Sequence, residues 1–153
     1  MRECVRTNFA DNKIHRSRFM SPEGGGMEIK MSNDRVSKAN YYLDIAQTVS
    51  ERATCMRRHF GAIIVKDDVI VSTGYNGAPR GRQNCCDLKT CLREQMAIPR
   101  GERYELCRSV HAEANAIIAA PRDRMLGADL YLACIDAKTG KLVGGTTSCQ
   151  MCK

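Results

Sequence analysis

Two short patterns of metal-ligating residues constrain this chain more than any other feature. The first is His111-Ala112-Glu113, and the second is the pair Cys149 and Cys152 near the end of the sequence. One imidazole and two thiolates supply three protein ligands to zinc and leave a fourth position open, as in catalytic zinc sites. Glu113 does not share a helical face with His111, so we expect it beside the metal as a proton shuttle. The fold must then bring the two patterns together.

Each pattern alone has an ordinary explanation. The first fits a core histidine followed by a capping glutamate, and the second fits a redox pair or a structural zinc site. Their occurrence together and in this order, each at the start of a predicted helix with a strand between them, favours a single catalytic zinc. The combination of H-x-E and C-x-x-C is the signature of zinc-dependent deaminases.

Hydrophobic periodicity predicts an α/β layered domain. The expected elements are a helix capped by Asn33 or Asp34 and running to about residue 53, strands over 60–65 and 69–75, a helix over 110–120 and a strand over 128–135. Residues 136–143 are expected to turn and return. Ser148 is a suitable N-cap for a helix that would carry Cys149 and Cys152.

Composition limits the cellular setting and the partners. A chain of 153 residues predicts one domain, and nine cysteines without a secretory signal indicate a reducing compartment, the cytoplasm, and metal binding. No apolar run approaches the length of a membrane span. The net charge of +7 comes from scattered Lys and Arg without any Trp. This distribution favours an anionic small substrate over nucleic acid.

The first 31 residues differ from the rest of the chain. They are polar, have no clear period and end in the glycine-rich SPEGGGMEIKM. We expect a disordered extension, or translation from too early a start with Met27 or Met31 as the true one; an ordered N-terminal arm is the alternative. The predicted domain therefore covers 32–153.

A loop and a cysteine-rich insert separate the hairpin from the central helix. Asn76, in the loop TGYNGAPRG, could line a pocket or simply adopt a left-handed turn. The insert, over 84–108, holds several cysteines that could bind a second, structural zinc or could be small buried residues. The proposed ligands are Cys55, Cys85, Cys91 and Cys107, with Cys86 as a substitute.

The sequences TGYNGAPRG, NCCD, RSVHAEANAI and SCQMCK, in this order, resemble the deoxycytidylate deaminases of the cytidine-deaminase-like superfamily. The resemblance covers roughly 32–153. It implies a three-layer α/β/α fold around a mixed sheet. It also implies zinc-dependent hydrolysis of dCMP to dUMP and ammonia by a homo-oligomer, a dimer or hexamer, with dCTP and dTTP as effectors.

The resemblance also assigns individual roles. It makes His111, Cys149 and Cys152 the zinc ligands and Glu113 the acid and base, and it places Asn76 and Ala112 at the substrate. Arg80 and Arg82 are candidates for binding the phosphate, with solvated arginines as the alternative. Family members continue beyond the second cysteine through a helix and at least one strand, so this chain is expected to be C-terminally truncated.

Three other functions share parts of this pattern. The first is a zinc deaminase of another substrate, such as cytidine, a tRNA adenosine, or a pterin or flavin precursor. The second is a zinc-containing module that binds nucleic acid through its basic surface. The third is a fragment without activity of its own.

Overall fold

The computed structural model describes residues 2–8, 14–19, 35–99, 101–148 and 152, with the backbone alone for the two N-terminal ranges. Its elements in chain order are β1 (Arg2–Asn8), β2 (Ile14–Phe19), α1 (Lys38–Ser50), β3 (Arg58–Lys66), β4 (Val69–Tyr75), α2 (Cys85–Leu88), α3 (Leu92–Gln95), the 3-10 helix η1 (Tyr104–Leu106), α4 (Ala112–Ala119), α5 (Arg122–Met125) and β5 (Asp129–Asp136). The predicted hairpin, central helix and third strand are all present. No helix within these described ranges is long and apolar enough to cross a bilayer.

The strands form one sheet in the order β2-β1-β5-β3-β4. All the pairs in it are antiparallel, because β4 returns along β3 and β5 enters beside β3 from the opposite direction. The prediction of a mixed sheet is therefore not met within the described residues. Residues 61–65 of β3 are all buried, as expected for a strand covered on both faces.

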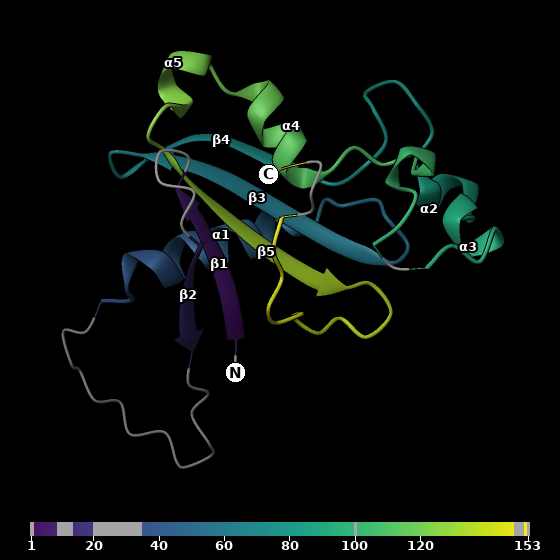
Figure 1. Cartoon of the computed structure of the whole chain (residues 1–153), viewed down its shortest axis with the longest axis horizontal. Coiled ribbons are helices and arrows are strands. Elements are labelled where there is room, and N and C mark those ends of the chain that lie inside the picture. Colours follow the sequence, from purple (N-terminus) through teal and green to yellow (C-terminus); the bar gives the residue numbers. More distant parts are fainter. Residues whose placement is uncertain (1, 9–13, 20–34, 100, 149–151, 153) are drawn as a thin grey trace, which may run out of the picture.

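Helices cover both faces of this sheet and give three layers (Figure 1). On one face, α1 packs Leu43 and Ala46 against Ile63 of β3. On the other face, α4 packs Ala116 against Ile64. Alternate residues of β3 thus serve two cores, because successive side chains on a strand point to opposite faces. The predicted three-layer α/β/α architecture is confirmed.

Helix α1 begins later than the sequence pattern predicts. Its N-cap is Ser37, whose hydroxyl accepts a hydrogen bond from the backbone N–H of Asn40 at 3.3 Å. The predicted caps, Asn33 and Asp34, lie outside the described residues. The Ser37 hydroxyl thus pairs one of the backbone N–H donors that the first turn of a helix leaves without an intrahelical partner. This capping explains why the helix starts after Ser37.

The N-terminal segment also differs from the prediction. Residues 2–8 and 14–19 are strands, and β1 pairs with β5 from Val5 opposite Leu132 to Asn8 opposite Asp129. The expectation of a disordered extension is therefore wrong for these two segments. The backbone groups along one edge of β5 pair with β1, and a polar segment without clear hydrophobic period can form such a pairing through its own backbone. The rest of 1–34 lies outside the described residues.

Two glycines allow the helices to approach the sheet. A Cβ added at Gly61 would lie 2.0 Å from the carbonyl oxygen of Ala46 in α1. A Cβ added at Gly74 would lie 2.3 Å from the carbonyl oxygen of Ala112 and 2.4 Å from the nitrogen of Ala116. The backbone of α4, which follows His111, therefore lies directly on β4.

A tyrosine of α1 fastens this helix to the turn between β3 and β4. The hydroxyl of Tyr42 donates to the Asp68 carboxylate at 2.6 Å, and Lys38 also donates to that carboxylate. The hydrogen bond to Asp68 is the main reason that the pKa of Tyr42 rises to about 12. The bonds from Lys38 and Tyr42 in turn lower the pKa of Asp68 below its usual value.

Gly74→Ala should destabilise the domain by about 1–3 kcal/mol, because its methyl group would meet backbone atoms of α4 that have no alternative position. Urea unfolding measures this loss. Thr73→Ala, at the adjacent exposed position of β4, is the control and should cost less than about 1 kcal/mol. Equal effects of the two substitutions would show that α4 does not depend on this close contact.

Asp68→Asn should make the domain less stable at neutral pH and leave it unchanged in acid. The lowered pKa of Asp68 means that the fold favours its ionised form, so the contribution is present above the usual pKa of 3.8 and lost as pH falls through the lowered value. Urea unfolding across this range gives the pH dependence. Asp67→Asn on the same turn is the control. A stability difference that persists in acid would contradict this assignment.

Candidate metal centre and substrate cavity

The backbone around residue 77 determines where His111 lies. Gly77 and Val110 exchange two backbone hydrogen bonds, of 3.2 and 2.8 Å, in an isolated antiparallel bridge. The chain then enters α4 with His111 as the N-cap residue, and its carbonyl accepts from the N–H of Asn115 at 3.0 Å. The predicted helix start at Val110 is therefore two residues too early. The bridge holds Val110 extended, and α4 begins at Ala112.

This helix start brings His111 and Glu113 together. Because His111 precedes the helix, the rule that residues two apart do not share a face does not apply to the pair. Glu113 lies in the first turn and is 5% exposed, while Ala112 between them is fully buried. One donor atom each from His111, Glu113 and Cys152 lie within 4.8 Å of one another. A carboxylate at this distance can exchange a proton with a group bound to the metal, which is the role predicted for Glu113 from the sequence.

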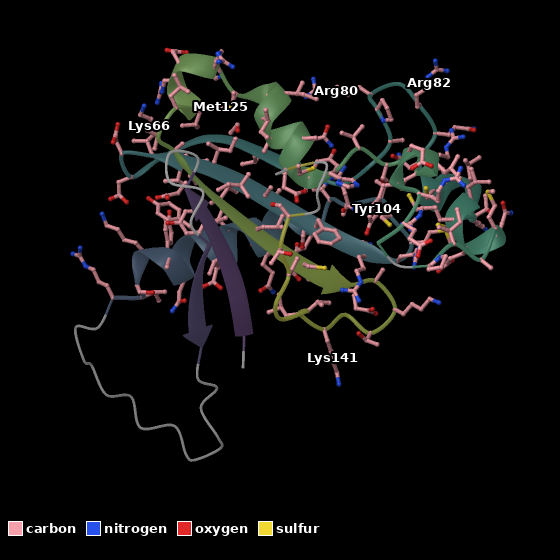
Figure 2. The ribbon with its side chains drawn as sticks, viewed as in Figure 1. Lys66, Arg80, Arg82, Tyr104, Met125 and Lys141 are labelled. Carbon is pink, nitrogen blue, oxygen red and sulfur yellow. The ribbon has the colours of Figure 1, made fainter. Side chains whose placement is uncertain are left out.

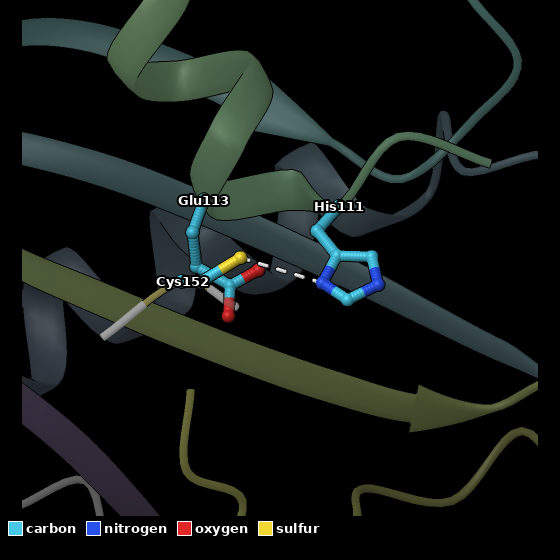
Figure 3. A group of neighbouring side chains, drawn as sticks. All are labelled: His111, Glu113 and Cys152. Carbon is cyan, nitrogen blue, oxygen red and sulfur yellow. Dashed lines mark hydrogen bonds between the residues drawn. The ribbon is translucent and has the colours of Figure 1, made fainter. Parts of the chain in front are cut away.

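The C-terminal segment reaches the same place by doubling back along β5. The N–H of Val143 binds the carbonyl of Cys134 at 2.8 Å, and Ile135 and Leu142 form an isolated bridge. This is the return predicted for residues 136–143. Cys152 then lies with its Sγ 3.4 Å from Nδ1 of His111, beside the Glu113 carboxylate (Figure 3). Two residues of the predicted ligand set thus meet.

The donor set suits zinc. Zinc is bound in proteins by imidazole nitrogen and thiolate sulfur, and these are the atoms that His111 and Cys152 present. The third predicted ligand, Cys149, and the helix expected to carry it lie outside the described residues. One further thiolate and an open position would complete a catalytic tetrahedron.

A cavity of about 270 Å³ opens beside this group. Its walls come from the start of β3, the end of β4, the insert, the start of α4, and the segment around Thr146. His111, Ala112 and Glu113 all line it. The cavity therefore places a small ligand against the candidate metal centre.

Asn76 lines this cavity, as predicted, and its side chain also hydrogen-bonds to the backbone of β3. Its Oδ1 accepts from the N–H of Phe60 at 2.8 Å, and its Nδ2 donates to the carbonyl of Arg58 at 2.9 Å. The side chain is 6% exposed. The amide nitrogen of Asn76 carries two N–H donors, and the second one has no acceptor among the residues that the structure describes, so a ligand could accept from it. Asn76 is not among the described residues with positive φ, so the left-handed turn is excluded.

The cysteines proposed for a second zinc also line the cavity. They are Cys55, Cys85, Cys91 and Cys107. Burial, followed by the nearby thiols of the other three, raises the pKa of Cys85. Within the described ranges, the cluster of potential metal ligands is that of His111, Glu113 and Cys152, and these cysteines do not form a second one. Cys86, the proposed substitute, is exposed and donates to Asp87 instead.

The two arginines proposed for the phosphate lie elsewhere. Arg80 and Arg82 are exposed on the loop after β4, and neither lines the cavity (Figure 2). Sequence reasoning missed three arginines that do line it: Arg57, Arg58 and Arg93. A signal was available, because Arg57 and Arg93 each follow a proposed zinc-binding cysteine by two positions.

Comparisons with known proteins also indicate zinc binding by this chain. Residues 36–153 match the family model of the cytidine and deoxycytidylate deaminase zinc-binding region. The deoxycytidylate deaminase of Schizosaccharomyces pombe is 36% identical over 100 residues, which cover 65% of this chain and 30% of that protein. The deoxycytidylate deaminase of Mycobacterium phage D29 is 41% identical over 97 residues, covering 60% of this chain and 73% of that protein.

Among solved structures, the chain resembles the dCMP deaminase of the cyanophage S-TIM5 in its apo form, with 30% sequence identity and a TM-score of 0.38. That match covers 53% of this chain and 51% of the other. The chain spans less than a third of the fungal relative's length. The family match covers most of the chain, including both metal-ligating patterns. The chain therefore belongs to the cytidine and deoxycytidylate deaminase family, whose defining region binds zinc.

Proposed function

We propose that this protein hydrolyses dCMP to dUMP and ammonia. The observation that carries the proposal is the convergence of His111, Glu113 and Cys152, of which His111 and Glu113 also line the cavity. The similarity to proteins named deoxycytidylate deaminase supports dCMP as the substrate over other cytosine compounds.

His111, Cys149 and Cys152 would hold the catalytic zinc. Zinc bound there supplies a Lewis acid that makes a water molecule acidic enough to react at neutral pH. His111 is suited to this role because the bridge between Gly77 and Val110 fixes the backbone before it, and Tyr104 contacts its ring edge-on with the centroids 5.3 Å apart. A ligand held on two sides keeps its orientation when the substrate enters.

Glu113 would move the protons. Its carboxylate takes a proton from the attacking water and delivers it to ring nitrogen 3 as the oxygen bonds to carbon 4 of cytosine. It then transfers the remaining hydroxyl proton to the amino group, the bond between carbon 4 and that nitrogen breaks, and ammonia leaves. Burial of Glu113 to 5% exposure keeps this exchange away from bulk water. Ala112 and the free N–H of Asn76 would contact the nucleoside.

The insert would hold a second, structural zinc through Cys55, Cys85, Cys91 and Cys107. All four line the same cavity, and the thiols of the other three are close enough to Cys85 to help raise its pKa, after burial, which supports this assignment. A closed site of four thiolates is a common structural zinc site. It would stabilise a segment whose own helices, α2 and α3, have only four residues each.

The assembly and its setting are further parts of the proposal. Ile118 on α4 and Leu126 after α5 are 78% and 62% exposed, which supports a homo-oligomer, a dimer or hexamer, that covers this face. The effectors would be dCTP and dTTP, as the resemblance to deoxycytidylate deaminases implies. The high cysteine content supports a reducing compartment, the cytoplasm, as the location.

Glu113→Gln should abolish turnover of dCMP, by a factor of roughly 10² or more, while zinc content stays unchanged. The loss follows because an amide cannot carry the proton from water to nitrogen 3. Ammonia release from dCMP, cytidine and an RNA stem-loop gives activity and substrate preference together, and elemental analysis gives the zinc content. Retained turnover would refute the role of Glu113. A preference for cytidine or RNA would refute the choice of substrate.

The wild-type chain should contain two zinc ions, and Cys85→Ser should contain one. Cys85 is buried among the other insert cysteines, so its loss removes a ligand from the structural site alone. Cys86→Ser is the matched control and should retain both ions, because Cys86 is exposed and binds Asp87. One zinc ion per wild-type chain would rule out the second site. Loss of an ion in Cys86→Ser would overturn the choice of ligands.

A further inference from the structure

Two arginine side chains at the cavity carry N–H donors that no described residue accepts. Nη1 of Arg57 and Nε of Arg93 are buried and have no hydrogen-bond partner within the described residues. Both residues line the cavity. Buried polar groups are nearly always hydrogen-bonded, and the exceptions indicate a missing ligand, ion or water. Two such donors in one cavity indicate a ligand with acceptor oxygens.

Arg93 is held in place as a binding residue would be. The residue is 6% exposed, and its Nη2 donates to the backbone carbonyls of Pro99, at 2.9 Å, and Glu102. The guanidinium lies over the ring of Tyr104, with its Cζ 4.4 Å from the centroid. These contacts fix the plane of the group and leave Nε to bind. No carboxylate in the described part of the chain forms an ion pair with Arg93, so its positive charge can attract an anion.

Arg57 completes the cationic end of the cavity. Its Nε lies 3.8 Å from Oε1 of Glu94, beyond normal hydrogen-bond distance, and its side chain is 30% exposed. Glu94 therefore compensates part of the positive charge of Arg57 but accepts no hydrogen bond from its Nη1. Because Glu94 adjoins Arg93 on α3, this ion pair also brings the start of β3 close to the insert.

The same contacts connect the two arginines to the metal centre. Tyr104, under the Arg93 guanidinium, meets the ring of His111 edge-on with the centroids 5.3 Å apart. A ligand bound to Arg93 therefore lies next to the residues that react. The two arginines and the buried acid Glu113 line the same cavity.

We infer that Arg57 and Arg93 form an anion subsite that binds the 5′-phosphate of the nucleotide, with Tyr104 as the positioning residue between this subsite and His111. The inference rests on the proposed function, which it deepens. Arginine pairs with phosphate oxygens through directed N–H donors, so the subsite distinguishes a nucleotide from its nucleoside. The cysteine-rich insert thereby supplies part of the substrate specificity.

The test compares binding of dUMP with binding of deoxyuridine, which differ only in the phosphate and require no turnover. Isothermal titration calorimetry on the zinc-supplemented full chain should show dUMP binding at least roughly tenfold tighter, equivalent to about 1.4 kcal/mol. Arg57→Gln should remove most of this difference and leave deoxyuridine binding unchanged. Arg93→Lys should remove part of it, because the charge stays and the planar group is lost.

Two controls protect the conclusion. Arg80→Gln and Arg82→Gln alter exposed arginines outside the cavity and should bind both ligands as the wild type does. Thermal unfolding reports whether each variant folds. If Arg93→Lys does not, Arg57→Gln decides the test alone, because its side chain is partly exposed.

Three results would overturn the inference. The first is equal affinity of the wild-type chain for dUMP and deoxyuridine. The second is that Arg57→Gln lowers the affinity for both ligands equally, and the third is that Arg80→Gln or Arg82→Gln lowers the affinity for dUMP. Failure of the proposed function looks different. The chain would bind dUMP through Arg57 and Arg93 as described, and would release no ammonia from dCMP.

Discussion

The contact of α4 with β4 at Gly74 is the constraint on which the candidate site depends. No side chain separates the two backbones there, so the first turn of α4 has one position on the sheet. The bridge between Gly77 and Val110 then determines the direction in which the chain enters the helix. Together these contacts direct His111 and Glu113 into the cavity. The site is thus built on rigid backbone rather than on a loop.

The insert is best understood as a wall of the catalytic cavity. Its short helices contribute little apolar surface, so cysteines and a buried arginine take the place of a hydrophobic core. Arg93 joins this segment to the metal centre through Tyr104, and Arg57 joins it to β3 through Glu94.

Prediction from the sequence succeeded where local patterns were strong. The hairpin strands were predicted to within two residues because apolar runs and the Asp67-Asp68 turn define them. Helix α1 was predicted to begin too early, since competing caps are close together in sequence. The strand β1 was missed altogether, because a polar strand is recognisable only from the edge of β5 that it pairs with. Strand pairing between distant segments leaves no local signal.

By itself the sequence determined the family and the three-layer fold. It also indicated His111, Glu113 and Cys152, which the structure brings together, because the chemistry of zinc restricts which side chains can serve and in what spacing. Only the tertiary structure decided which cationic residues face the cavity. Arg80 and Arg82 stand beside the family's loop motif and are exposed, whereas Arg57 and Arg93 lie in distant segments and line the cavity together. The direction of a side chain and its neighbours depend on packing between segments, which residue spacing cannot express.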